Sequence, residues 1–461
     1  MTEQQDLIVE RDEDEYGIDP RVVDAILDAV AAGDVARLEQ LMEPLHAADI
    51  ADLLEQIDSD DREALVRLWP QGIDGDVLSE LDESIREEVV ELLPQDVLAE
   101  AVRDLDSDDV VDLVEDLEEP QQERILQALE DSDRVAVQQS LTYPEYSAGR
   151  LMQREVVALP EHWTVGEAID YLRSASELPD QFYHIILVDP RWHPVGQVGL
   201  GRLLASPRAT PLKDIAEEDF RVIRVFDEEA DVAYLFNQYH LISAPVVDDS
   251  GRLVGVITID DAMTVLDEEA EEDILRLAGV GEEGGLSGRL IDTVRDRAVW
   301  LFVNLLTAIL ASMVINQFAD TIDQLVALAV LMPIVASMGG NAGTQTMTVA
   351  VRAIATRDLT PRNAMRMIWR EITVGTANGM LFGVLMALVA GFWFGIPMLS
   401  VVIAVAMLFT LVAAACGGIL IPLLLDRFGI DPALASGPFV TTVTDVVGFF
   451  AFLGLASSVL L

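Results

Sequence analysis

The chain has 461 residues, of which 80 are Asp or Glu and 29 are Lys or Arg, so its formal net charge is −51, yet 51% of its residues are hydrophobic. Such a chain must keep its charged and apolar segments apart. Residues 1–140 carry a net charge of −34, residues 141–285 carry −17, and residues 286–461 carry none. The absence of a basic stripe argues against a nucleic-acid partner. The single cysteine, Cys416, excludes an internal disulfide and a Cys-rich zinc site.

The first 140 residues combine an acidic tail with a repeat. Residues 1–30 are strongly acidic and lack the apolar core of a signal peptide. Residues 31–140 contain similar segments spaced by 24 residues, and each has an acidic cluster followed by apolar residues at helical spacing. These segments begin at Ile57, Leu81, Leu105 and Leu129. The spacing predicts an α-helical solenoid of short stacked helices.

Residues 141–266 differ from the repeat because they combine predicted strands with helices. A strand–helix–strand–strand–helix pattern occurs twice, and the two copies resemble a tandem pair of CBS domains, an α/β module known for binding nucleotides. The second copy has Thr258 followed by Asp261, which predicts a nucleotide site with ATP as the candidate ligand. The first copy lacks this Thr/Asp pair.

An acidic connecting helix is expected within residues 267–296. Eight carboxylates lie within the fourteen residues from Asp260 to Asp273. On a helix many of them are like-charged neighbours, which destabilises the helix unless cations screen them. A hard divalent cation would suit such oxygen ligands. The alternative is a solvated acidic linker.

Residues 297–461 are expected to form an all-α membrane domain. Three stretches are free of charge or nearly so at 298–319, 324–351 and 432–461, and a fourth, 372–425, has no charge over 54 residues. Because about 20 apolar residues cross the hydrocarbon, the long stretch must contain two helices, which makes five spans in total. We expect the break near Gly395-Ile396-Pro397.

The arginines predict the orientation in the lipid bilayer. Three of them precede the first span, five lie in residues 352–370, and Arg427 follows the fourth span, whereas the other connections have none. Basic loops face the cytoplasm. The prediction is a multi-pass protein of the cell (inner) membrane with its N-terminus in the cytoplasm and its C-terminus outside.

Asp445 is the most informative residue of the spans. A carboxylate in mid-span costs about 2.5–3.5 kcal/mol on insertion scales and marks a functional site by default. No lysine or arginine lies inside any span, so a cation is its natural partner. The alternative is a protonated structural residue. Asn341 and Gln345 in the second span, and Thr441 one turn before Asp445, are predicted to line a wet pore.

The order of these parts resembles the MgtE family of magnesium transporters. The resemblance is carried by the segments YPEYSAGRLM at 143–152, GNAGTQ at 340–345 and SGPFVTTVTD at 436–445, together with the repeat, the CBS pair and the acidic linker. It implies a homodimeric Mg²⁺ channel with five spans per subunit and a cytosolic Mg²⁺ sensor. By this resemblance Asp445 binds the ion in the pore, and the regulatory metal positions are Asp261, Glu269, Glu272, Asp273 and, on a weaker match, Glu228. His240 and Thr264 depart from the aspartates of the family pattern.

The predicted function is therefore uptake of Mg²⁺ through a channel gated by cytosolic Mg²⁺. Two alternatives remain, namely a CBS-regulated membrane sensor without ion flux, and an exporter or a Co²⁺/Ni²⁺ transporter. Soft metals favour imidazole or thiolate ligands, and the spans contain no histidine. No GxxxxGK or HExxH motif is present, so neither a P-loop pump nor a zinc protease is expected, and the chain is predicted not to be an enzyme.

Overall fold

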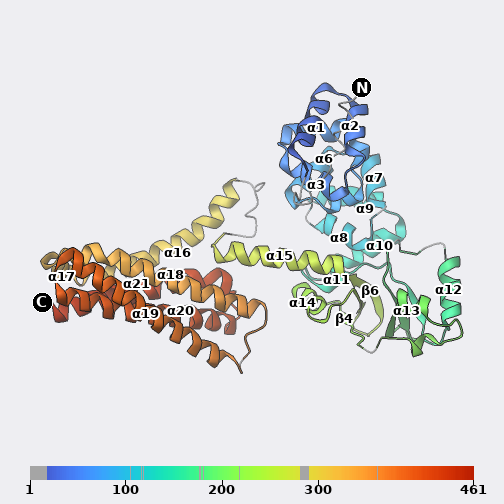
Figure 1. Cartoon of the computed structure of the whole chain (residues 1–461). Coiled ribbons are helices and arrows are strands. Elements are labelled where there is room, and N and C mark those ends of the chain that lie inside the picture. The colour runs from blue at the N-terminus through green and yellow to red at the C-terminus, as the bar shows by residue number, and fades with distance from the viewer. Residues whose placement is uncertain are drawn as a thin grey trace, which may run out of the picture. The chain divides into compact units, whose positions relative to one another are not determined.

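The computed structural model describes residues 18–460, apart from 104, 116, 118, 176, 177, 180, 218, 281–289 and 361 (Figure 1). Residues 1–17 of the acidic tail and 281–289 of the linker thus lie outside the described residues. The chain forms two compact units, Met1–Glu269 and Ala270–Leu461, and each is described by itself.

The first unit begins with a stack of short amphipathic helices. Every second helix starts 24 residues after the last, at Ser59, Glu83, Ser107 and Asp131, so the predicted repeat is confirmed as a helical one. The helices are α1 Pro20–Ala32, α2 Val35–Met42, α3 Ala47–Gln56, α4 Ser59–Leu68, α5 Gly75–Ser79, α6 Glu83–Leu92, α7 Gln95–Arg103, α8 Ser107–Glu115, α9 Glu119–Ala128, α10 Asp131–Ser140 and α11 Ala148–Leu151.

Buried arginines join successive repeats. Arg62 and Arg86 occupy equivalent positions, and only 5% and 7% of their surfaces are exposed. Each guanidinium donates to a backbone carbonyl that precedes its own helix. Arg62 Nε donates to Leu54 O at 2.7 Å, and Arg86 Nε donates to Leu81 O. Each also pairs with a carboxylate of the next repeat, Arg62 with Glu88 and Arg86 with Asp112. One guanidinium thus ties two repeats together.

We predict that Arg86→Met weakens this part of the molecule. The substitution removes donors from buried carbonyl groups, which costs about 1–3 kcal/mol. The local free energy of opening of α6 and α8, measured by hydrogen exchange, should fall by that amount. Arg134→Met is the matched control, because the Arg134–Asp131 pair is exposed within one helix. Equal protection in the two variants would contradict the role given to Arg86.

Two similar α/β modules complete the first unit, which confirms the predicted pair of strand–helix–strand–strand–helix copies. Their sheets have the orders β1-β2-β3 and β4-β5-β6, with a parallel first pair and an antiparallel second pair in each. The elements are β1 Ala158–Pro160, α12 Val165–Ser174, β2 His184–Val188, β3 Pro194–Gly199, α13 Leu200–Ala205, β4 Ile223–Arg224, α14 Glu229–Tyr239, β5 Ser243–Val247 and β6 Leu253–Thr258.

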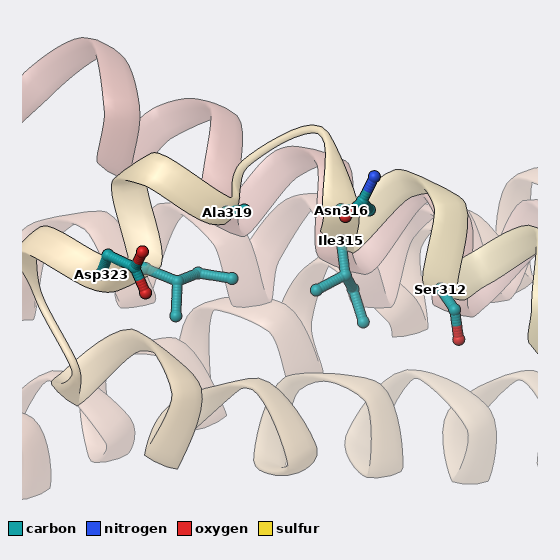
Figure 2. Close-up of a pocket in the computed structure, with 6 residues that line it drawn as sticks. Ser312, Ile315, Asn316, Ala319 and Asp323 are labelled. Carbon is teal, nitrogen blue, oxygen red and sulfur yellow. The ribbon is translucent and has the colours of Figure 1, made fainter.

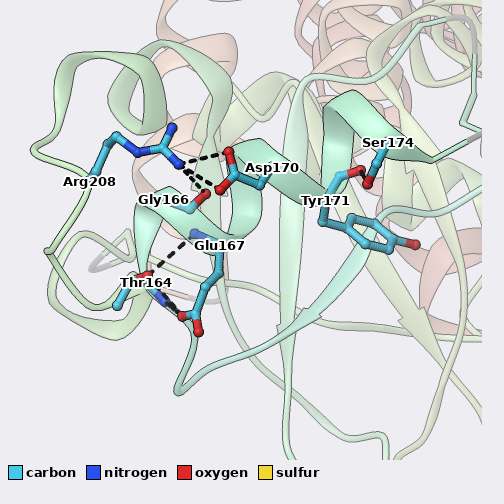
Figure 3. Close-up of polar contacts among 7 residues, drawn as sticks. All are labelled: Thr164, Gly166, Glu167, Asp170, Tyr171, Ser174 and Arg208. Atoms are coloured by element: carbon cyan, nitrogen blue, oxygen red, sulfur yellow. Dashed lines mark hydrogen bonds and ion pairs between the residues drawn. The ribbon is translucent and has the colours of Figure 1, made fainter.

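The start of α12 shows how local sequence fixes these helices. The Thr164 hydroxyl accepts from the backbone N–H of Glu167 at 3.3 Å, and the Glu167 carboxylate accepts from the N–H of Thr164 at 2.7 Å, a reciprocal cap drawn in Figure 3. Asp170, on the same helix, forms an ion pair at 2.7 Å with Arg208, which lies in the loop after α13. The helix that follows β6 is α15, which runs without a break from Ile259 to Leu277.

Among its described residues the second unit has five helices that are long and apolar enough to cross a membrane, as predicted. They are α16 Leu290–Asn316, α18 Ala327–Ala355, α19 Ala364–Phe394, α20 Pro397–Arg427 and α21 Pro432–Val459, with the short helix α17 Ala319–Gln324 between the first two. The break between α19 and α20 falls at Gly395-Ile396, as expected. Helix α20 packs against α18, α19 and α21.

Candidate functional site

Helices α18 and α21 pack closely against each other, so one face of each is buried and the opposite face is exposed. A Cβ atom on Gly343 would lie 2.7 Å from Val440 Cγ1, so this glycine permits the contact. The other side of α18 carries Asn341 and Gln345, which are both exposed. Two of the predicted pore-lining side chains therefore lie on one polar face of a spanning helix.

Asp445 lies in the middle of α21, as the fourteenth of 28 residues. It is partly exposed, and the exposed Thr441 lies one turn before it. Within the described residues Asp445 makes no ion pair, and the sequence has no lysine or arginine in 298–351, 372–426 or 428–461. The carboxylate thus has no positively charged partner inside the spans of its own chain.

A hollow of about 330 Å³ lies between the end of α16 and the short helix α17 (Figure 2). Ser312 of α16 and Asp323 of α17 border it on two sides. None of the residues predicted from the sequence lies there. The hollow marks the polar end of α16 and α17 and contains no group of ligands that would hold an ion.

Asp261 is positioned at the start of α15 by the motif residue Thr258. Its carboxylate accepts from the Thr258 backbone N–H at 3.2 Å and from the hydroxyl at 2.8 Å. The Thr258 hydroxyl also contacts Asp260. These bonds hold the carboxylate of Asp261 in a fixed place beside α8.

Carboxylates of α8 face Asp261 across the contact between the helical repeat and the second CBS-like copy. Asp108 is only 8% exposed, and burial, followed by the charge of Asp261, raises its pKa well above the ordinary value. The same two causes raise the pKa of Asp109 to about 7. Burial also raises the pKa of Asp261, with Asp260 as the next cause. This group of carboxylates (Asp108, Asp109, Asp260 and Asp261) is called the α8–α15 cluster below.

Glu229 belongs to a second group of facing carboxylates. Its pKa is raised to about 7, mainly by burial and next by the negative charge of Glu268. The charges of Glu115 and Glu269 raise it further. Glu228, the residue predicted from the sequence, is exposed and forms the N-cap of α14. The structure therefore brings Glu269 towards Glu229, whereas Glu228 lies at the surface. Sequence reasoning missed Glu229, Asp108 and Asp109.

The raised pKa values give the pH dependence of this contact a definite sign. A carboxyl group whose pKa is raised in the compact arrangement stabilises it when protonated. That stability is complete below about pH 4, the ordinary range of these groups. It is lost as the pH rises through about 7, the value reached by Asp109 and Glu229. Above about pH 7 these groups are ionised, and a cation bound between them would offset their repulsion.

The second half of α15 faces the start of α21. Arg276 pairs with Glu272 at 2.8 Å and with Asp431 at 3.4 Å. Burial, then the charge of Asp431, raises the pKa of Asp273. The predicted residues Glu272 and Asp273 thus lie beside Asp431, which the sequence analysis did not single out. The guanidinium of Arg276 supplies positive charge at this point.

The ligand atoms that these clusters offer are of the type that binds a hard cation. All of them are carboxylate oxygens, which Mg²⁺ and Ca²⁺ prefer. Yet nowhere in the part of the chain that the structure describes do three His, Cys, Asp or Glu side chains converge closely enough to hold a metal. A bound ion would require these side chains to move together or to be bridged by water.

A narrow cleft separates the two CBS-like copies. It is lined among others by Glu155, Ser243 and Thr258, and its volume is only about 10 Å³. His184 Nδ1 lies 2.7 Å from the Ser243 hydroxyl and links the two copies across it. A nucleotide would need this cleft to open.

Comparisons with known proteins agree with this architecture. Residues 332–455 match the family model described as MgtE, divalent cation transporter, residues 45–146 match the MgtE intracellular N domain, and residues 212–268 match the CBS domain. The chain is 33% identical over 321 residues to the magnesium transporter MgtE of Enterococcus faecalis, with 70% of this chain and 71% of that protein covered. It is 34% identical over 326 residues to that of Thermus thermophilus, with 69% and 71% covered.

A solved structure described as the cytosolic domain of the Mg²⁺ channel MgtE in complex with ATP aligns with a TM-score of 0.49 and 30% identity, over 53% of this chain and 99% of that chain. The family consists of transporters rather than enzymes, which agrees with the expectation that this chain is not an enzyme. The matches to the N domain, the CBS domain and the divalent cation transporter follow one another along the chain, and the chain belongs to the MgtE family.

Proposed function

We propose that this chain transports Mg²⁺ across the membrane and that Asp445 binds the ion on its way. The observation that carries the proposal is the unpaired carboxylate at the centre of a spanning helix, next to an exposed polar face. A charge at that depth is stable only beside a cation, in water, or as a protonated acid. A passing cation in a wet path supplies the first two of these conditions.

The ligand chemistry favours Mg²⁺ over softer metals. Asp445, Thr441, Asn341 and Gln345 all offer oxygen atoms, and the spans contain no histidine. Mg²⁺ dehydrates reluctantly and keeps several waters, so a carboxylate can hold it through those waters. Co²⁺ and Ni²⁺ favour nitrogen or sulfur ligands.

A second copy of the chain completes the path in this proposal. Asn341, Gln345 and Thr441 are exposed on a single chain, and polar side chains at membrane depth are not left facing lipid. Covering this face with its own copy about a twofold axis would place two Asp445 carboxylates opposite each other. The chain would then act as a homodimer.

We predict that Asp445→Asn leaves the chain folded and membrane-inserted but reduces Mg²⁺ flux into proteoliposomes by at least about tenfold, because the amide lacks the charge that holds the ion. Asp426→Asn is the matched control, since Asp426 is exposed at the end of α20. Flux of the folded Asp445→Asn variant at the level of the control would remove the support for this residue as the ion site.

Cytosolic Mg²⁺ is proposed to close the path by bridging the facing carboxylates. In the first unit it would neutralise the α8–α15 cluster and the group around Glu229 and Glu269. In the second unit it would act on Glu272 and Asp273, which lie beside Asp431 of the membrane domain. Because α15 runs from one group to the other without a break, binding at either end can bias the same helix.

A combined variant tests the sensor. With Asp261, Glu269, Glu272 and Asp273 replaced by their amides, we predict that the channel stays open at cytosolic Mg²⁺ concentrations that close the wild type. A shift from 1:99 to 99:1 needs about 5.5 kcal/mol, so losing several weak sites should move half-inhibition by more than tenfold. The measurement is the current of inside-out patches as Mg²⁺ is varied.

The matched control for this variant is Asp267→Asn with Glu271→Gln, two exposed carboxylates of the same helix. It should close as the wild type does. Unchanged inhibition of the fourfold variant would show that its carboxylates are only a solvated surface. An equal loss in the control would show that the effect is one of general charge.

Two further assignments belong to this proposal. The helix ends that carry the arginines are inferred to face the cytoplasm, so the N-terminus lies inside and the C-terminus outside. ATP is a candidate ligand of the CBS-like pair, supported by the Thr258–Asp261 contact and by the ATP complex of the similar cytosolic domain. The cleft must open for this to occur.

A further inference from the structure

The connection between α18 and α19 differs in charge from the rest of the chain. Residues 352–370 contain five arginines and one acidic residue, although the whole chain has a net charge of −51. All five arginines are exposed. In the part of the chain that the structure describes, Arg352, Arg362, Arg366 and Arg370 form no ion pair with a carboxylate. Within the described residues these four arginines therefore form a cationic surface without a carboxylate partner.

Apolar side chains accompany these arginines on the first turns of α19. Arg366 and Arg370 are four residues apart and share one face of the helix. Met365 and Trp369 are also four residues apart and lie on the neighbouring face, each 62% exposed. The only acid of this segment of helix, Glu371, is 8% exposed and does not offset the positive face.

Helix length places this segment at the level of the lipid headgroups. Helix α19 has 31 residues, so it is about 46 Å long at 1.5 Å per residue. Its uncharged part, 372–394, already spans about 34 Å, which exceeds a hydrocarbon layer of about 30 Å. Residues 364–371 must then project into the interface, where tryptophan side chains are enriched.

We propose that the surface formed by Arg352, Arg362, Met365, Arg366, Trp369 and Arg370 binds anionic phospholipid headgroups in the leaflet at this end of the membrane domain. Guanidinium groups bind phosphate oxygens in a bidentate manner. Clusters of four or more arginines next to a spanning helix favour anionic lipid. A lipid interface accommodates the exposed Met365 and Trp369 as well, whereas an acidic protein surface would satisfy only the arginines.

The test uses the full-length chain in nanodiscs that contain phosphatidylglycerol and phosphatidylcholine. Native mass spectrometry after release should show phosphatidylglycerol retained in preference to phosphatidylcholine. Arg366→Gln with Arg370→Gln should reduce that preference by about fivefold per arginine, and so by about 25-fold for the pair. Arg427→Gln, an exposed arginine at the end of α20 on the same side, should retain the wild-type preference.

Four outcomes would overturn the proposal. The first is equal retention by the wild type and the double variant, and the second is an equal loss in Arg427→Gln. The third is release of the bound lipid by millimolar inorganic phosphate alone, which would make the surface a site for free phosphate. The fourth is cross-linking of Met365→Cys, in a Cys416→Ala background, to the acidic residues 1–280 in the same nanodiscs. This result would assign the surface to the chain's own cytosolic part and contradict lipid binding.

Discussion

Carboxylates that lie close together in poorly hydrated surroundings, with no arginine or lysine between them, impose the constraint on which both units depend. Such groups must be protonated, hydrated or bound to a cation. Asp108, Asp109 and Asp261 meet this condition in the first unit, and Asp445 lies without a basic partner in the middle of a spanning helix of the second. Where the structure has to stay closed without an ion, it uses arginines instead, as at Arg62 and Arg86. Contacts in which an arginine lies between the carboxylates are therefore fixed. Contacts between carboxylates without an arginine or lysine respond to cations.

Local sequence patterns predicted most of the architecture. The 24-residue spacing gave the starts of α4, α6, α8 and α10 closely, because an acidic cap followed by apolar residues at helical spacing is a local signal. The intervening helices of each repeat, the short α17 and the continuity of α15 were not predicted. The intervening helices α3 and α5 begin at side-chain caps, His46 and Asp74, but these do not fall at the 24-residue spacing of the acidic clusters. Residue 266, the boundary expected from the sequence, lies inside α15.

The site was predictable where a residue contradicts its surroundings. Asp445 is conspicuous in an apolar run, so sequence alone could single it out as a candidate. Asp108 and Glu229 look like ordinary surface acids, and their pKa values are raised by burial and then by carboxylates of other segments, Asp261 for Asp108 and Glu268 for Glu229. For the same reason Glu228 could not be distinguished from Glu229 by sequence. The pairing of Arg276 with Asp431 joins segments that no local pattern connects.

The central claim is that ions pass along the polar face of α18 and α21 between two copies of the chain. It is tested most directly by Thr441→Cys in a Cys416→Ala background, treated in membranes with a short bifunctional thiol reagent. The account predicts cross-linked dimers that no longer conduct Mg²⁺. It predicts no cross-linking for Leu388→Cys, a 68% exposed position on α19. Dimers from Leu388→Cys together with none from Thr441→Cys would contradict the account.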